Sequence, residues 1–411
     1  MSSMHSSRLI LTATAMAAAM CAAPGLAQAQ EFRIGALNPV TGAGSPYGPG
    51  MQKAILLAVD EVNAAGGAGG RKLVVFTEDT QTQPQAAVLA AKKLIEVNKV
   101  QAILGTWSSG VTLAVMPLTD AAGLIQMNVS GAPAISVEDK KDLVWRFQAT
   151  NDRFGQAFAE IAKKRNFTRP GTMAFNNASG RGNTDGFTKA WTAGGGKVVG
   201  SVVYEPNRPS YRSELQQVLG EKPDVIVTGS YLPDTTIFLR EWYQSGEKNK
   251  WIMPGWAANP ELIKALGPEV TEGLISVDTV SSETAPSYKN FDAAYLKATG
   301  KPASSNVYAA MTYDMVISLA LAMEAAGPNA NVEQINSKIR DVSNAPGTKV
   351  YSFAEGKSLL GRKQKIDYDG ASSKLDFDKF GDASPDFGVY VIEKGQLVRK
   401  EMISLKPASG N

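Results

Sequence analysis

Short runs of β-branched and aromatic residues alternate with stretches of helical periodicity along most of the chain, and this alternation limits the folds that it can form. The first run, residues 32–37, precedes a stretch in which apolar side chains recur at helical spacing from Met51 to Val62. The same order of strand and helix continues through residues 72–127. Alternation of this kind favours an α/β fold with a parallel sheet covered by helices on both faces.

The alternation then starts again and predicts a second unit of similar size. The expected helices are 152–164, 184–192, 210–219 and 234–245, and the expected strands are 171–175, 198–204, 224–228 and 251–253. A strand at 274–277, helices at 287–298, 305–325 and 331–341, and short strands in 368–378 and 389–392 are expected to follow. A chain of 411 residues with 44% hydrophobic residues is long and apolar enough for two cores.

The first 29 residues have the features of an export signal. Arg8 precedes an apolar, alanine-rich run at residues 9–23, and Ala27 and Ala29 are small residues of the kind that a signal peptidase recognises. We therefore expect residues 1–29 to be a signal peptide cleaved after Ala29, and the mature protein to lie outside the cytoplasm. A lipoprotein acceptor at Cys21 is the weaker alternative, because the residue before it is not small.

The chemistry open to the exported chain is limited, because His5 and Cys21, its single histidine and cysteine, lie in the predicted signal. A Ser-His-Asp triad, a cysteine nucleophile, a cysteine zinc site and an imidazole-held metal are therefore excluded, and we expect no cofactor. The net charge of +3 gives no electrostatic reason to expect a nucleic-acid partner. We also expect no later apolar run to approach the length that spans a bilayer.

A candidate binding loop, residues 105–112, follows the apolar run at residues 100–104 and precedes a helical pattern. Free backbone N–H groups and short hydroxyls at the start of a helix suit a carboxylate or another small polar acceptor. Ser108 and Ser109 are the candidate ligand-binding residues of this loop. The simpler alternative is that one of these serines only caps the helix.

Motifs spread over residues 30–411 carry a resemblance to a known family. They are residues 32–35, 39–42, 58–67, 105–109, 123–125, 229–231 and 375–378, with Gly48, Gly370 and Gly381. In this combination they resemble the periplasmic solute-binding proteins of branched-chain amino acid ABC importers. The resemblance implies the type I periplasmic-binding-protein fold, in which two doubly wound parallel-sheet lobes are joined by a three-crossing hinge and close over a solute.

By analogy with that family, the first lobe takes residues 30–148 and 280–381, and the second takes residues 149–279 and 382–411. The resemblance implies a periplasmic, monomeric protein that performs no catalysis. Its expected partners are a small-molecule solute and the membrane permease subunits of an ABC importer.

The resemblance also implies positions for a ligand site. In the family, a serine at the place of Ser109 and backbone groups at the place of Ser130 bind the ligand carboxylate. A tyrosine matching Tyr231 holds the polar end of the ligand, and aromatic residues near Tyr47 and Tyr308 border its side chain. For each of the three tyrosines, packing between the lobes is the plain alternative.

Departures from the family bear on the ligand. Ala132 replaces a threonine that helps to orient the ligand ammonium, and residues 254–257 lack the expected acidic residue. A buried ammonium without an acidic partner is costly, so two ammonium contacts are expected to be missing. Trp107 and Trp256 predict a broad aromatic pocket, and Arg181 offers a bidentate clamp for a carboxylate. Lobe packing for the tryptophans and a solvated loop for Arg181 are the alternatives.

These features favour the capture of a branched-chain or hydrophobic amino acid, or of a related small carboxylate or amide. An exported hydrolase that uses paired carboxylates is an alternative, because its chemistry needs neither His nor Cys. However, Asp376 and Asp378 would point to opposite faces of a strand, and the chain has no Gly-x-Ser-x-Gly motif. A ligand-binding co-receptor for a membrane sensor would use the same cleft and remains the second alternative.

Overall fold

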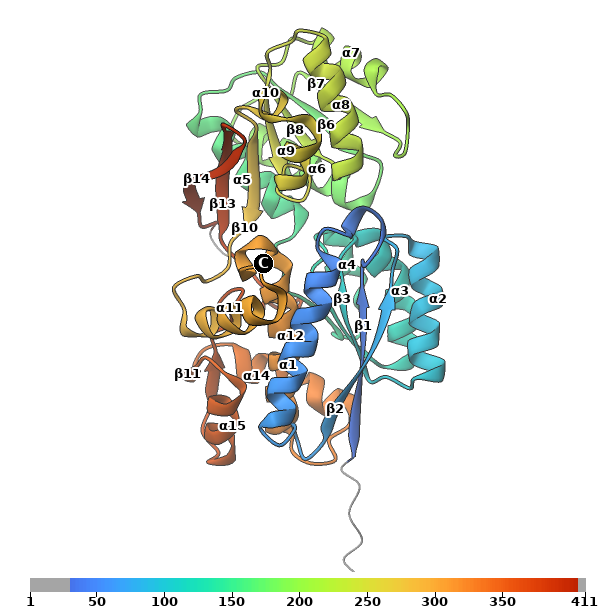
Figure 1. Cartoon of the computed structure of the whole chain (residues 1–411), viewed down its shortest axis with the longest axis vertical. Coiled ribbons are helices and arrows are strands. Elements are labelled where there is room, and N and C mark those ends of the chain that lie inside the picture. Colours follow the sequence, from blue (N-terminus) through green and yellow to red (C-terminus); the bar gives the residue numbers. More distant parts are fainter. Residues whose placement is uncertain (1–29, 406–411) are drawn as a thin grey trace, which may run out of the picture.

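Two β-sheets, one in each half of the molecule, form the frame of the fold in the computed structural model (Figure 1). The structure describes residues 30–405. The predicted signal peptide and Cys21 therefore lie outside the described residues.

The first sheet has the strand order β2-β1-β3-β4-β5, and all of its neighbouring strands are parallel. Its strands are β1 Glu31–Asn38, β2 Lys72–Asp79, β3 Ala102–Thr106, β4 Ile125–Asn128 and β5 Val144–Arg146. The helices between them are α1 Gly48–Ala64, α2 Pro84–Lys92, α3 Ser109–Ala122 and α4 Pro133–Glu138, and a short π-helix at Lys93–Val97 extends α2. Every residue of β3 and β4 is buried. Burial explains the apolar run at β3, whereas β4 also buries the polar Gln126 and Asn128.

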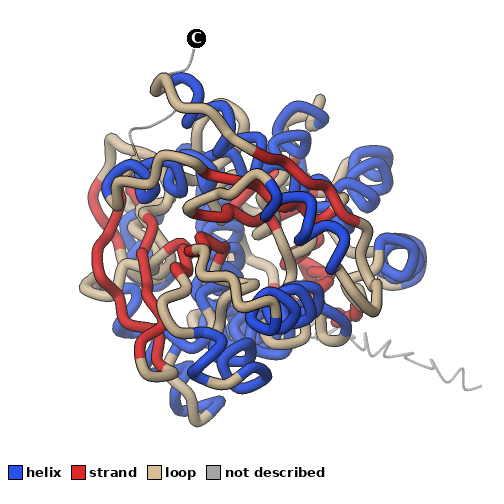
Figure 2. The backbone as a smooth tube through the Cα atoms, turned by 90° about the horizontal axis from the view of Figure 1, so that it is seen from above, coloured by secondary structure: helices blue, strands red, loops and turns tan. Residues whose placement is uncertain are grey.

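The second sheet has the order β14-β13-β10-β9-β8-β6-β7. Its strands are β6 Pro170–Phe175, β7 Gly200–Tyr204, β8 Val225–Gly229, β9 Lys250–Pro254, β10 Ile275–Thr279, β13 Phe387–Glu393 and β14 Gln396–Ile403. The first five are parallel, as predicted, but β13 and β14 form an antiparallel hairpin at one edge, which lies at the left in Figure 2. A two-residue turn at Lys394 and Gly395 joins them, so no crossover helix is needed there.

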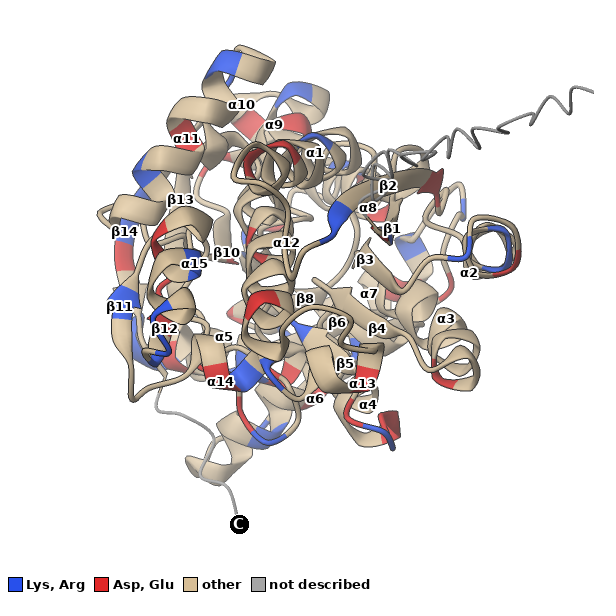
Figure 3. Ribbon diagram, turned by 90° about the horizontal axis from the view of Figure 1, so that it is seen from below, with Lys and Arg blue, Asp and Glu red and all other residues tan. Residues whose placement is uncertain are grey.

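The helices of the second lobe surround this sheet. They are α5 Asn151–Lys164, α6 Ala178–Ala193, α7 Arg212–Gly220, α8 Leu232–Gln244, α9 Pro260–Leu266 and α10 Pro268–Thr271. Charged residues of both signs are distributed over the helices of both lobes (Figure 3).

The chain then returns to the first lobe. This part contains α11 Pro286–Thr299, α12 Val307–Ala326, α13 Val332–Asn336, α14 Ile339–Ser343, β11 Thr348–Val350, α15 Phe353–Gly361 and β12 Ile366–Tyr368. Here two predictions are wrong: the helix expected at 331–341 is the two short helices α13 and α14, and residues 369–378 contain no strand. The buried Asp314 explains the second, because it accepts hydrogen bonds from the backbone N–H groups of Ala371 (2.9 Å) and Ser372 (2.7 Å). Those N–H groups are then not available to a strand partner.

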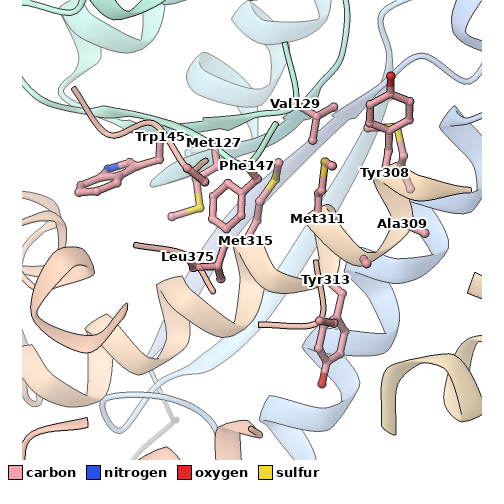
Figure 4. Packing of buried hydrophobic residues seen from close by; sticks show 14 of the residues in the cluster. Met127, Val129, Trp145, Phe147, Tyr308, Ala309, Met311, Tyr313, Met315 and Leu375 are labelled. Carbon is pink, nitrogen blue, oxygen red and sulfur yellow. The ribbon is translucent and has the colours of Figure 1, made fainter. Parts of the chain in front are cut away.

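The core of the first lobe forms around α12 (Figure 4). Met311 and Met315 of this helix face a cluster that includes Phe147, Met127 and Val129. By length and composition, α12 is the one helix among residues 30–405 that could cross a membrane, so the expectation of no such run was wrong. However, 83% of its apolar window is buried inside the protein, as expected for a core helix.

The chain passes between the two sheets at three places: after β5, after β10 and before β13. The first and third crossings are joined at Arg146 and Asp382, whose Nε and Oδ1 atoms lie 2.8 Å apart. Backbone bonds flank this pair, because Arg146 donates its N–H to the carbonyl of Gly381 (2.8 Å) and accepts the N–H of Ala383 (2.9 Å). The Arg146 side chain is 1% exposed and that of Asp382 is 11% exposed. The ion pair is therefore largely shielded from water.

Substitution of Asp382 by Asn should lower the free energy of unfolding by about 3 kcal/mol, because it leaves the buried guanidinium of Arg146 without a counter-charge. The matched control is Asp142→Asn, which breaks a pair with Arg340 in which the two side chains are 52% and 29% exposed. That change should cost less than about 1 kcal/mol. Urea unfolding at pH 7.5 measures the free energy of unfolding of both variants. Equal losses would contradict the role given to the pair of Arg146 and Asp382.

Candidate functional site

The loop after β3 brings Ser108 and Ser109 to the start of α3. Ser108 occupies the N-cap position, but its hydroxyl makes no capping hydrogen bond. Ser109 instead accepts the backbone N–H of Ala132 at 3.1 Å through its Oγ. The capping alternative therefore does not describe these hydroxyls, since Ser109 links the loop after β3 to the loop after β4.

Ser130 lies in that second loop and is fully buried. Its hydroxyl donates to the carbonyl of Trp107 at 2.9 Å and lies 2.6 Å from the hydroxyl of Thr112. Its backbone N–H donates to Oδ1 of Asn128 at 2.9 Å. Of the backbone groups predicted to hold a ligand carboxylate at this position, the N–H of Ser130 is thus already used within the protein.

Four of the predicted aromatic residues meet at the boundary between the lobes. The ring centroids of Tyr47 and Tyr308 lie 5.0 Å apart, and Trp107 lies 5.8 Å from Tyr47 and 6.1 Å from Tyr308. From the second lobe, Tyr231 reaches Trp107 at 5.3 Å. A hydrogen bond of 2.9 Å from Asn259 Nδ2 to the Tyr47 hydroxyl also joins the lobes. The structure therefore has the lobes in contact, as in a closed form.

The phenol of Tyr231 marks the polar side of this region. Burial raises its pKa, and hydrogen bonding from Ser108, Asn177 and Ser179 opposes the increase. Ser108 belongs to the first lobe and the other two to the second, so one hydroxyl meets polar groups of both lobes. Tyr231 therefore lies at the polar position that was predicted for it.

A small cavity of about 20 Å³ lies at the centre of this region. Its walls are Trp107, Val129, Gly131, Gln148, Asn151, Phe154, Ser179, Tyr231, Trp256 and Tyr308. In this closed form it has room for about one water molecule. Among the described residues, none that lines it carries a charge.

Arg181 and Ala132 lie elsewhere. Both line a separate cavity of about 680 Å³ beside α4 and α6. Arg181 is exposed, and its Nε donates to Oδ1 of Asn176 at 3.0 Å. The structure therefore does not bring Arg181 to the cavity walls formed by Trp107, Trp256 and the tyrosines.

The indole N–H of Trp256 donates to the carbonyl of Ser230 at 3.0 Å, which fixes this ring in the wall.

Sequence reasoning missed Gln148 and Asn151, which line the cavity where the first crossing enters the second lobe. They are 2% and 1% exposed. The sequence offered one signal that could have found them. The expected lobe boundary falls between residues 148 and 149, and hinge residues of a two-lobed protein border the cleft.

A carboxylate also lies where the sequence lacked one. The loop after β9 has Gly255, and a Cβ there would lie 2.3 Å from Oδ2 of Asp278 on the neighbouring strand β10. Glycine thus makes room for Asp278. The sequence of the loop alone could not reveal this carboxylate, because it comes from another strand. Burial raises the pKa of Asp278 to about 7, opposed by a 2.8 Å hydrogen bond from the backbone N–H of Thr279. Its negative charge adds to the burial that raises the pKa of Tyr47 and Tyr308.

Comparison with known proteins identifies the family. A family profile described as periplasmic binding protein matches residues 31–362. The chain belongs to the periplasmic binding protein family. This confirms the resemblance seen in the sequence, and membership of the family implies an extracytoplasmic location.

The relatives of this periplasmic binding protein carry names of the same kind. The Leu/Ile/Val-binding protein BraC3 of Rhizobium johnstonii is 25% identical over 394 residues, which are 95% of this chain and 99% of the relative. The leucine-binding protein LivK of Thermotoga maritima has a TM-score of 0.78 at 24% identity, covering 91% of this chain and 99% of its own. A solute-binding protein of R. palustris, solved with benzoate, has a TM-score of 0.72 at 21% identity, covering 90% and 96%. The predicted fold is confirmed.

Substitution of Asp278 by Asn should remove a pH dependence of stability. The carboxyl of an unfolded chain ionises near pH 4, whereas burial holds the pKa of Asp278 at about 7 in the folded protein. The folded state therefore binds the proton more tightly, and the parent should lose stability relative to Asp278→Asn as pH rises from about 4 to about 7. Urea unfolding at several pH values measures the difference. Asp185→Asn, on the exposed side of α6, is the control, and parallel curves for parent and Asp278→Asn would contradict the assignment.

Proposed function

We propose that this protein is the extracytoplasmic solute-binding component of an ABC importer. It captures a branched-chain or hydrophobic amino acid, or a related small carboxylate or amide, and delivers it to the permease without catalysis. Export by a cleavable signal peptide, the periplasmic location and the monomeric state are parts of this proposal. The names of the relatives support it, because they describe binding proteins for leucine, isoleucine and valine and a solute-binding protein solved with benzoate.

The observation that carries the proposal is that both lobes supply walls of one cavity. Trp107 and Tyr308 come from the first lobe, and Tyr231 and Trp256 from the second. A solute held between these walls contacts both lobes only when they are closed. It therefore binds the closed state more tightly and shifts the population toward it. The permease then has a closed form to recognise.

We also propose the lobe boundaries expected from the sequence, with residues 30–148 and 280–381 in the first lobe and 149–279 and 382–411 in the second. The sheets support them for the described residues, because β1–β5 lie in one sheet and β6–β10 with the β13–β14 hairpin lie in the other. The solute should therefore close the angle between these two bodies.

Solute binding is tested on residues 30–411 by thermal shift against L-amino acids, small carboxylates and small amides. A solute at one hundred times its dissociation constant should add about 2.7 kcal/mol of stability, and small-angle scattering should show a smaller radius of gyration if closure follows binding. With any solute that binds, Trp107→Ala should weaken binding by about 2 kcal/mol, because a buried aromatic wall is lost.

Arg181→Ala is the matched control, because Arg181 lies outside the aromatic cavity. It should change the affinity by less than about 0.5 kcal/mol. Calorimetric titration well below the melting temperature gives both values. A loss at Arg181 that matched the loss at Trp107 would restore the arginine clamp and move the site. Stimulation of a sensor kinase, without stimulation of the ATPase of a reconstituted importer, would replace transport by signalling.

A further inference from the structure

We propose that the cavity recognises an uncharged carboxamide group on its solute, through Gln148 and Asn151. This inference rests on the proposed solute-binding function and names the chemical class of the solute. It begins from two buried amide groups in the cavity wall whose hydrogen-bonding capacity the protein uses only in part.

Gln148 supplies an unused donor. Its Oε1 accepts the backbone N–H of Ala149 at 2.9 Å, which fixes the orientation of the side-chain amide. Its Nε2 is buried and has no hydrogen-bond partner among the described residues. The amide lies beside the hydroxyl of Tyr308 and acts against the increase in the pKa of that phenol. The amide nitrogen carries two N–H groups, so a contact of one with the Tyr308 hydroxyl leaves the other for a solute.

Asn151 supplies an unused acceptor and lines the same cavity. Its Nδ2 donates to Oδ1 of Asn183 at 2.7 Å, and its Oδ1 is buried with no hydrogen-bond partner among the described residues. Its backbone N–H donates to the carbonyl of Gly131 at 2.6 Å. A Cβ at Gly131 would lie 2.5 Å from Oδ1 of Asn151. Glycine therefore makes room for this amide in the cavity wall.

A buried donor and a buried acceptor are costly to leave unpaired, and a solute that pairs with both removes that cost. A carboxamide presents a carbonyl oxygen to Nε2 of Gln148 and an N–H to Oδ1 of Asn151. A carboxylate has acceptor oxygens only, so one of them would meet the lone pairs of Asn151 Oδ1. The pair therefore favours the amide over its isosteric acid.

The charges around the cavity disfavour an anionic solute. None of the lining residues is a Lys or Arg that would balance an anion. The charge of Asp278 acts on Tyr47 and Tyr308, and it would repel a carboxylate held beside them. The apolar body of the solute would lie against the rings of Trp107 and Trp256 once the lobes open enough to admit it.

The test compares isosteric pairs by calorimetric titration of residues 30–411 at pH 7.5: benzamide with benzoate, and isovaleramide with isovalerate. L-leucine, L-isoleucine and L-valine are titrated beside them. At least one amide should bind at least tenfold more tightly than its acid and than the amino acids. An acid or an amino acid that binds as tightly as any amide overturns the inference but leaves the proposed function standing. If no compound of the three sets binds, both fail.

Variants then assign the recognition to the side chains. Gln148→Met keeps the length of the side chain and removes the Nε2 donor together with the Oε1 acceptor of the Ala149 N–H, and it should weaken amide binding at least tenfold. Gln216→Met, on the exposed side of α7, is the matched control and should leave the affinity unchanged. An amide affinity that Gln148→Met does not alter would overturn the assignment to Gln148. Because the amide-to-acid comparison uses the parent protein, it holds even where a variant fails to fold.

Discussion

The buried ion pair between Arg146 and Asp382 is the constraint on which the two-lobed arrangement depends. A guanidinium removed from water needs a counter-charge and acceptors for its remaining N–H groups. Here it has Asp382, the carbonyl of Ala132 at 3.0 Å and the hydroxyl of Ser136 at 2.8 Å. The N–H of the same Ala132 donates to Ser109. Three successive interactions thus connect the hinge to the candidate binding loop. The sequence drew attention to Ala132 because it lacks the threonine hydroxyl of the family, but it is the backbone of Ala132 that makes two of these interactions.

Much of the fold could be predicted from the sequence because its signals are local. The fully buried strand β3 lies in an apolar run, and α1 buries one face at helical spacing. The elements that were missed depend on distant partners. Residues 369–378 have turn residues and short apolar positions, but the buried carboxylate of Asp314 takes their N–H groups. The return of the chain to the first lobe was available only through the family resemblance.

The candidate site divides in the same way. Trp107 and Trp256 follow β3 and β9, and large aromatic residues beside strand ends are visible in a sequence. The three tyrosines were expected through the family resemblance. Gln148 and Asn151 carry no such mark, since their importance comes from burial without a partner. Asp278 lies 23 positions beyond Gly255, and only the pairing of β9 with β10 brings the two together.

The division of the cavity walls between the two lobes has a consequence for kinetics. A solute that contacts walls of both lobes loses those contacts when the lobes separate. The residence time of the solute is then limited by the rate of opening, and mutations at the hinge would change it without touching the binding surface. The crossings, rather than the aromatic walls, would determine how long the captured molecule is held before it meets the membrane.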